Sequence, residues 1–270
     1  MGLLEKQLER QVTLLYLLNT RSSNLNKLAR KLTITDKTLI ADIEHFNDSY
    51  FPVHIEVNNH KEVSLTIPNN VNLDDIFVKI LNNSINVKIL KYIVIYEPTL
   101  TEISQSLFLS KTSIRRIVSK INNYFYTETI NIQIDLQAKL MVVGNETEIR
   151  RLFACMFKEM YRIQEFAYFD SIYQLIRRCL KAQNKTASAP KIIYSVYYIF
   201  LSIIRIGHKH FVPEDELENK EMVVTELLTV IQKDTVFTTL MSQKYKFNVT
   251  RNNVANVLSS SFGLLFTTDT

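Results

Sequence analysis

The sequence has few residues that form tight turns or disulfides, with four glycines, five prolines and two cysteines among 270 residues. It has no tryptophan. Because glycine and proline mark tight turns, their scarcity favours helices joined by short connections. Cys155 and Cys179 are too few for a disulfide framework and lack the spacing of a metal site. We expect both to be small buried side chains.

Signals for export, membrane insertion and catalysis are also missing. The segment from Glu5 to Arg10 is charged and no small-residue cleavage site follows it, unlike a signal peptide. The most apolar run, Ile192 to Ile206, falls short of the roughly 20 residues that span a bilayer. No glycine-rich phosphate loop, Gly-x-Ser-x-Gly or His-Glu-x-x-His occurs. The sequence predicts a cytoplasmic protein that does not bind membranes, is not an enzyme, and needs no cofactor or metal.

The composition is that of a folded, mildly basic protein. Hydrophobic residues make up 46% of the chain, the formal net charge is +5 and the pI is about 9.0. The length gives room for two or three domains with their own cores. A positive balance suits a nucleic-acid partner without requiring one. We interpret the acidic run from Pro213 to Glu221 as a solvated helix start.

The most informative feature is a segment that occurs twice, first as residues 25–47 and again as residues 100–122. Equivalent apolar positions are Leu25 and Leu100, Leu28 and Ile103, Leu32 and Leu107, Ile34 and Leu109, Leu39 and Ile114, Ile43 and Val118, and Phe46 and Ile121. Asn47 matches Asn122 at the end. Each copy predicts a short helix, a turn and a longer helix capped by Thr35 or Ser110, which is typical of a helix-turn-helix.

Alternating apolar residues follow each copy and predict a β-hairpin, so that each unit becomes a winged helix-turn-helix. The first hairpin lies between Val53 and Ile67, and the second between Ile130 and Val142. The 75-residue offset of the repeat also pairs Leu65 with Leu140, which predicts a hairpin free of insertions. The predicted helices of the two units span residues 4–19, 24–32, 36–47, 73–83, 84–96, 100–107 and 111–123.

After Gly144 the pattern is helical only. Glu146 and Glu148 are expected in the first turn of a helix, where negative charge is favoured. Helices are predicted at 146–161, 166–182, 190–206, 216–233, 236–243 and 250–262. The predicted fold is mainly α, with two tandem winged helix-turn-helix domains carrying small β-hairpins and then an all-helical bundle. The domain limits that we predict are 1–70, 71–144 and 145–270.

The longer helix of the second copy has a surface suited to double-stranded DNA. Its core face is apolar, and its other faces carry cations and hydroxyls but no acidic residue. Such a face attracts phosphates, and an arginine can pair with a guanine edge. The DNA contacts predicted on this helix are Ser110, Lys111, Thr112, Arg115, Arg116, Ser119 and Lys120.

The longer helix of the first copy is less suited to DNA, because Asp36, Asp42 and Glu44 lie outside its core face. Basic residues just upstream can still hold phosphates while the helix start touches bases. We therefore predict a supporting role for this unit. Its predicted contacts are Arg21, Lys27, Arg30, Lys31, Lys37, Thr38 and Ala41, with Lys61 at the wing tip.

The close histidine pair, His208 and His210, invites comparison with a metal site, since two histidines at this spacing face the same way on a strand. Here no strand pattern surrounds them and no acidic ligand pattern accompanies them. We interpret them as a surface pair after a helix end, with Gly207 as the C-terminal cap.

These features together resemble the Mga and AtxA type of regulators from Gram-positive bacteria. The resemblance rests on the two helix-turn-helix copies, on residues 144–150 (GNETEIR) and on residues 200–208 (FLSIIRIGH). It implies that the helical region is similar to a phosphotransferase-system regulation domain, in which histidines are phosphorylated. It therefore makes His208 and His210 candidate phosphorylation sites and phosphotransferase-system proteins candidate partners. Family members continue into further domains that help dimerisation, so a homodimer stays open for this chain.

The leading hypothesis is a transcription regulator that binds DNA with sequence preference and whose helical C-terminal region senses a signal or dimerises. One alternative is a plasmid replication initiator, because such proteins also use paired winged helices and a basic balance. A second alternative is an interaction module whose winged helices bind protein. The sites on bound DNA separate the first two, and absence of a salt-dependent DNA complex indicates the third.

Overall fold

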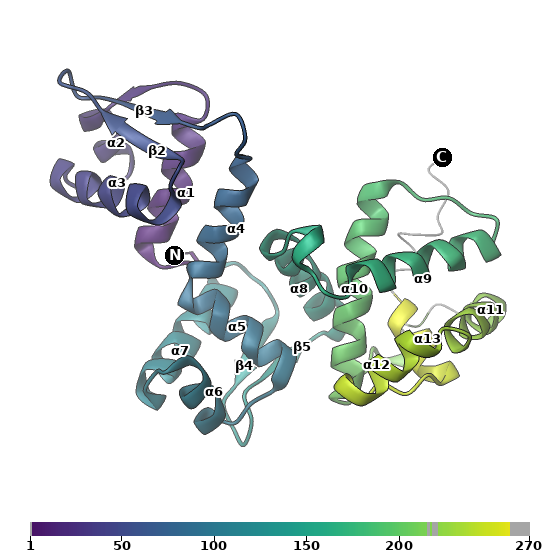
Figure 1. Cartoon of the computed structure of the whole chain (residues 1–270). Helices are drawn as coiled ribbons and strands as arrows, with labels where there is room; N and C mark the ends of the chain where they lie inside the picture. The colour runs from purple at the N-terminus through teal and green to yellow at the C-terminus, as the bar shows by residue number, and fades with distance from the viewer. Residues whose placement is uncertain (1, 215–216, 218–220, 260–270) are drawn as a thin grey trace. The chain divides into compact units, whose positions relative to one another are not determined.

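The computed structural model describes residues 2–214, 217 and 221–259. The chain forms two compact units, residues 1–89 and 90–270, whose helices and strands follow one another as labelled in Figure 1. The predicted fold class is confirmed, since the chain is mainly helical and carries small antiparallel hairpins. The unit boundary lies inside α5 (Ile85–Tyr96). The domain limits at residues 70 and 144 stay predictions.

The first unit is a winged helix-turn-helix followed by a helix that leads onward. Its elements before α5 are α1 (Lys6–Leu18), β1 (Ser23–Asn24), α2 (Leu25–Lys31), α3 (Asp36–Tyr50), β2 (His54–Val57), β3 (Glu62–Thr66) and α4 (Leu73–Asn83). The sheet has the order β1-β3-β2 and is antiparallel throughout. Strand β1 was not predicted, because two residues are too few to show a period of two. Leu14, Leu15, Leu39 and Phe46 are fully buried at the centre of this unit.

The second unit repeats the plan and adds a helical bundle. Its winged helix-turn-helix consists of α6 (Leu100–Leu107), α7 (Lys111–Thr127), β4 (Ile132–Asp135) and β5 (Met141–Gly144), with the end of α5 before them. The bundle follows as α8 (Glu146–Met160), a 3-10 turn at Ile163–Glu165, α9 (Phe169–Ala182), α10 (Ala189–Gly207), α11 (Glu221–Gln232), α12 (Thr235–Tyr245) and α13 (Arg251–Leu258). The described part of the acidic run, including exposed Pro213 and Glu214, precedes α11. The helix start predicted at 216 lies outside the described residues.

The repeat is not free of insertions. The side chain of Asn47 accepts from the backbone N–H of Ile55 at 2.7 Å and donates to its carbonyl at 2.9 Å. Asn122 makes the same pair of hydrogen bonds with Ile134, at 2.7 and 2.9 Å. The two asparagines are 75 positions apart, whereas the two strand residues are 79 apart. Four extra residues therefore lie between Asn122 and Ile134, and two of them lengthen α7, which has 17 residues where α3 has 15.

The strand partners show the same correction. Ile55 pairs with Leu65 in the first hairpin, and Ile134 pairs with Val142 in the second. The residue equivalent to Leu65 is therefore Val142, and the predicted match with Leu140 was wrong. The helix-turn-helix kept its spacing as far as Asn122 because its core positions are fixed by packing, while the exposed end of α7 and the connection to the wing tolerate insertion.

Replacing Asn122 by alanine is expected to lower the free energy of unfolding by about 1–3 kcal/mol, because the N–H and C=O of buried Ile134 lose their partner. Urea unfolding of the full chain measures the change. Asn123 next to it is exposed, so Asn123→Ala is the matched control and should change stability by no more than about 0.5 kcal/mol. Equal effects of the two substitutions would mean that Asn122 does not stabilise the contact between α7 and β4.

Helix α10 is the core helix of the bundle and is buried along most of its length. It is long and apolar enough to cross a membrane, and 72% of its apolar window is buried inside the protein. The predicted cap role of Gly207 was wrong, because the cap is His208 at φ −84°. A Cβ at Gly207 would lie 1.9 Å from the carbonyl oxygen of Tyr245, so close packing against α12 requires the glycine.

The two cysteines differ in environment. Cys179 is buried as predicted, and its apolar surroundings raise the pKa of its thiol to about 12. Cys155 is exposed, so the expectation that both cysteines are buried was wrong for this residue. Its position on the outer face of α8 escaped a prediction based on the apolar character of the stretch as a whole.

Candidate nucleic-acid interface and a buried ion cluster

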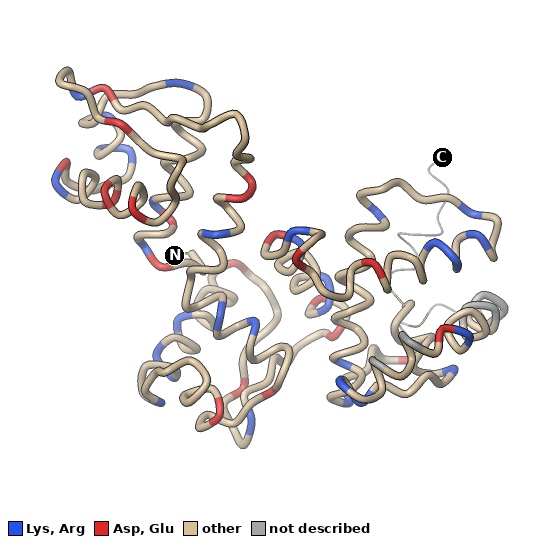
Figure 2. Tube along the Cα trace, in the orientation of Figure 1, with Lys and Arg blue, Asp and Glu red and all other residues tan. Residues whose placement is uncertain are grey.

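Helix α7 separates an apolar face from a cationic one. Ser110 caps its start by accepting a hydrogen bond from the backbone N–H of Ser113 at 3.0 Å. Ile114, Val118, Ile121 and Phe125 are buried against the unit. The exposed predicted contacts are Ser110, Lys111, Thr112, Arg115, Arg116 and Ser119, and Lys120 is half-buried. Figure 2 shows that α7 carries basic residues but no acidic one.

The corresponding helix of the first unit is less acidic at its surface than the sequence indicated. Asp42 is only 3% exposed, and its carboxylate accepts from Nε and Nη2 of Arg10 at 2.5 and 2.9 Å. It therefore does not contribute an exposed negative charge to α3. The remaining carboxylates of this helix are Asp36, Glu44 and Asp48, and its one lysine is Lys37. Figure 2 shows both acidic and basic residues on α3. The surface of α3 therefore carries charges of both signs, whereas the surface of α7 is cationic.

The predicted contacts of the first unit are nearly all accessible. Arg21, Lys27, Arg30, Lys31, Lys37, Ala41 and Lys61 are exposed, and Thr38 is half-buried. The hydroxyl of Thr38 lies 2.9 Å from that of Thr35, which also accepts from its N–H at the helix cap. At the wing tip Lys61 has φ 59°, and the side chain of Asn58 accepts from the N–H groups of His60 and Glu62. This local bonding accounts for the tip as a turn.

The two histidines after α10 are not a surface pair, so that interpretation was wrong. Their side chains are only 28% and 24% exposed, for His208 and His210 respectively. Nε2 of His210 lies 2.5 Å from Oε1 of Glu97, and Nε2 of His208 donates to the carbonyl of Ile95 at 2.9 Å. Among the described residues no cluster of histidine, cysteine and acidic side chains is arranged to hold a metal ion.

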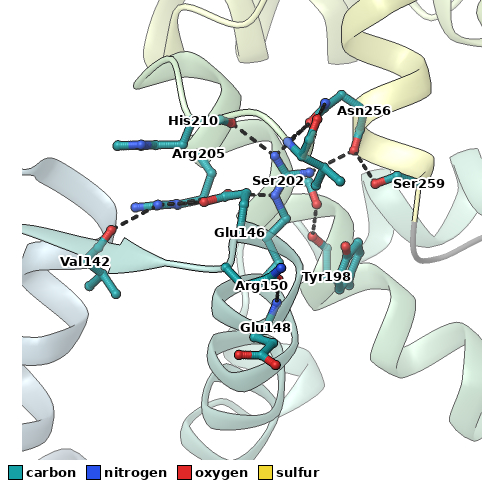
Figure 3. Close-up of polar contacts among 12 residues, drawn as sticks. Val142, Glu146, Glu148, Arg150, Tyr198, Ser202, Arg205, His210, Asn256 and Ser259 are labelled. Carbon is teal, nitrogen blue, oxygen red and sulfur yellow. Dashed lines mark hydrogen bonds and ion pairs between the residues drawn. The ribbon is translucent and has the colours of Figure 1, made fainter. Parts of the chain in front are cut away.

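Glu97 belongs to a larger cluster of buried charges, because Arg205 bonds to it. Figure 3 shows the other charged members, Glu146, Arg150 and Arg205. Arg205 of α10 donates from Nη2 to Glu146 at 2.7 Å, from Nη1 to Glu97 at 3.3 Å, and to the carbonyl of Val142 in β5 at 3.1 Å. Arg150 donates from Nε to Glu146 at 2.8 Å. All four charged side chains are at most 7% exposed.

A buried amide completes the cluster. Arg150 donates to the side-chain oxygen of Asn256 at 2.9 Å and to its carbonyl at 2.8 Å. The same amide group exchanges hydrogen bonds with the backbone of Val212, accepting at 3.2 Å and donating at 3.0 Å. Because charges without partners are costly inside a protein, this bonding stabilises the contacts among β5, α8, α10, α13 and the segment before α6.

Comparison with known proteins bears on this arrangement. Residues 69–157 match the Mga helix-turn-helix domain. This part of the chain is therefore similar to an Mga helix-turn-helix domain. The match starts before α4 and ends inside α8, so it contains the second winged helix-turn-helix together with Glu97, Glu146 and Arg150. The resemblance predicted from the helix-turn-helix copies is confirmed.

A relative supports the same assignment over a longer stretch. A protein of Streptococcus pneumoniae serotype 4 (strain TIGR4), named "Putative trans-acting regulator", is 26% identical over 224 residues. The matched region covers 79% of this chain and 44% of that relative, so the chain spans less than half the length of the protein that it matches. The similarity therefore extends beyond the Mga domain.

The buried ion cluster also shifts the pKa values of its two carboxyl groups, Glu146 and Glu97. Burial alone would raise the pKa of Glu146, but the hydrogen bond and charge of Arg205, with help from Arg150, hold it below the usual range. Burial would raise the pKa of Glu97 too, yet His210, His208 and Arg205 lower it. Both carboxyl groups are therefore held in their charged form at neutral pH.

Sequence reasoning missed this cluster. Glu146 looked like an ordinary acidic residue in a first helical turn, and Glu97 fell between two predicted helices of the Mga domain. One signal was present, because Arg150 lies four residues after Glu146 and such pairs share a helix face. The partners from α10 and α13 lie more than 50 positions away, so no local pattern could reveal them.

Proposed function

We propose that the chain binds double-stranded DNA through α7 and regulates transcription, with the first winged helix-turn-helix as a supporting contact. The observation that carries the proposal is the exposed face of α7, where Lys111, Arg115 and Arg116 stand without an acidic neighbour on the helix. Phosphates bind to such a face and release counterions, and an arginine can read a guanine. The Mga domain match and the trans-acting regulator relative support the same reading. Such a protein acts in the cytoplasm, where bacterial DNA lies.

The helical region is proposed to sense a signal or to dimerise. The buried ion cluster supports the first role, because Arg205 of α10 bonds to Glu97, two residues before the cap of α6. A change in the bundle that moves α10 would therefore act directly on the start of the helix-turn-helix. A homodimer and phosphotransferase-system partners belong to the same proposal, since both follow from the family resemblance.

Phosphorylation of His208 or His210 remains a proposal whose chemistry the geometry narrows. Each Nε2 faces an oxygen acceptor, the carbonyl of Ile95 or the carboxylate of Glu97, so in each neutral ring this nitrogen carries the hydrogen. The lone pair then resides on Nδ1, which is the atom expected to accept a phosphoryl group. Labelled-phosphate transfer from the general phosphotransferase proteins should be lost in the His208→Ala, His210→Ala variant, and transfer that persists would reject these sites.

Genome-wide recovery of bound DNA tests the proposed function. Recovery of sites next to promoters is the result expected of a regulator. Directly repeated elements confined to a plasmid origin would favour the replication initiator instead. Failure to recover any site, together with no DNA complex at low ionic strength, would favour winged helices that bind protein.

A further inference from the structure

Phe108 is the most exposed large apolar side chain of the described residues, with 95% of its surface accessible. It ends α6 in the turn of the second helix-turn-helix, at φ 54° and ψ 39°. This left-handed conformation is unfavourable for a bulky residue and is the usual place of a glycine. A single exposed apolar residue is ordinary by itself. One that also occupies a strained position, and buries nothing in return, requires another reason.

The turn itself does not need the aromatic ring. The equivalent residue of the first unit is Thr33, which has φ 56°. Its turn closes with the N–H of Ile34 bonded to the carbonyl of Ala29 at 3.0 Å, and the second closes with Leu109 bonded to Ser104 at 3.1 Å. The hydroxyl of Ser104 adds a bond to the carbonyl of Leu109 at 2.6 Å. Backbone bonds thus make the turn, and the choice of phenylalanine is left unexplained by the fold.

The surroundings of Phe108 indicate what its ring meets. Helix α7 begins two residues later at the Ser110 cap, followed by the exposed side chains of Lys111 and Thr112. A partner that covers this end of α7 has to satisfy cations and an apolar ring together. Duplex DNA offers both, since the major groove presents thymine methyl groups between two lines of phosphate.

We propose that Phe108 packs against a thymine C5-methyl group beside the bases that α7 contacts. This contact adds a preference for thymine to the electrostatic binding of the phosphates. This inference rests on the proposed function, since it names a further specificity-determining residue of the same DNA interface. Direct contact with apolar side chains is a known means of reading thymine. No base needs to unstack, because the methyl group already faces the groove.

Substituting Phe108 by glycine gives two effects of opposite sign. Glycine relieves the left-handed strain, so the melting temperature of the full chain should rise or stay unchanged. Affinity for DNA sites selected by the wild-type protein should fall by about five- to tenfold, from the loss of apolar burial. A residue with a purely structural role would lose stability and affinity together. Phe211→Ala, which removes an exposed aromatic of unit 2 outside the helix-turn-helix, is the control and should bind as wild type.

Replacing single thymines of a selected site by deoxyuridine removes only the methyl group. One replacement should weaken wild-type binding about fourfold, the effect of one buried methyl, and should leave binding by the Phe108→Gly variant unchanged. If Phe108→Gly binds as tightly as wild type while the Arg115→Ala, Arg116→Ala variant does not, the inference is overturned and DNA binding stands. That pattern, together with loss of regulation in cells, would assign Phe108 to a protein contact. If the wild-type chain binds no DNA, the proposed function itself fails.

Discussion

Replacing both Arg115 and Arg116 by alanine is expected to weaken DNA binding more than any other pair of surface changes in the chain. Each arginine that pairs with a guanine contributes about 1–3 kcal/mol, and one that contacts only a phosphate contributes less. Both side chains are exposed on α7 and neither has an acidic neighbour on that helix. Their charge is therefore available to an incoming phosphate backbone.

Titration of labelled DNA over a series of salt concentrations measures this effect. The slope of log affinity against log salt should decrease by about 0.9 for each phosphate contact that is lost. Arg177 and Lys181 are two exposed cations of α9, so Arg177→Ala, Lys181→Ala removes the same charge from the bundle as a matched control. If the control weakens binding as much as the α7 variant, the effect reports net charge and α7 is not the interface.

Replacing Arg205 by methionine is expected to destabilise the chain by about 3–5 kcal/mol. Arg205 is 1% exposed, and its guanidinium bonds to Glu146, Glu97 and the carbonyl of Val142. Methionine fills a similar volume but leaves the buried carboxylate of Glu146 without its main partner, which costs more than an intact ion pair contributes. Denaturant unfolding of the full chain gives the value. A loss below about 1 kcal/mol would mean that the cluster is not a major determinant of the fold.

The same variant has a predictable dependence on pH. In the wild type the pKa of Glu146 is lowered, so its contribution is present above the unfolded-state value near 4.5 and is lost as pH falls through the lower folded value. Without Arg205, burial outweighs Arg150 and the pKa of Glu146 rises. The cost of burying the unpaired Glu146 carboxylate is then present at neutral pH and shrinks as pH falls towards 4.5. The difference in free energy of unfolding between variant and wild type should therefore narrow in that range.

Arg178 supplies the control for this experiment. It forms an ion pair with Asp234, but 51% of its side chain is exposed. Because solvent screens exposed pairs, Arg178→Met should cost no more than about 1 kcal/mol. Its stability difference should also stay constant over the pH range in which the Arg205→Met difference narrows. A similar narrowing for both variants would point to the pH response of the unfolded chain.

Prediction from sequence worked best where chemistry repeats at short intervals. The helix-turn-helix of each unit was found because its buried residues recur at helical spacing, and because Thr35 and Ser110 cap the longer helices as expected. The cationic face of α7 followed from the same spacing once the core face was assigned. Charge on α3 was misjudged, since Asp42 is neutralised by Arg10 from a separate helix.

Prediction failed where distant segments meet. Apolar matching overlooked the extra residues between Asn122 and Ile134, and the true register follows from the hydrogen bonds of Asn122 to Ile134 and from the strand pairing. The histidines after α10 were taken for surface residues because their neighbours in sequence are polar. They instead form hydrogen bonds with Ile95 and Glu97, more than 100 positions away.

The sequence by itself determined the local order of this protein: two helix-turn-helix units with wings, a helical region after them, and a helix whose outer face is basic. These properties depend on residues within a few helical turns of one another, so hydrophobic periodicity and capping residues are enough to predict them. Tertiary structure alone decided which charges stay in solvent and which are buried in pairs. Arg205 is buried in an ion cluster and Arg115 is exposed to solvent. This difference is set by desolvation, which depends on segments that meet only when the chain has folded.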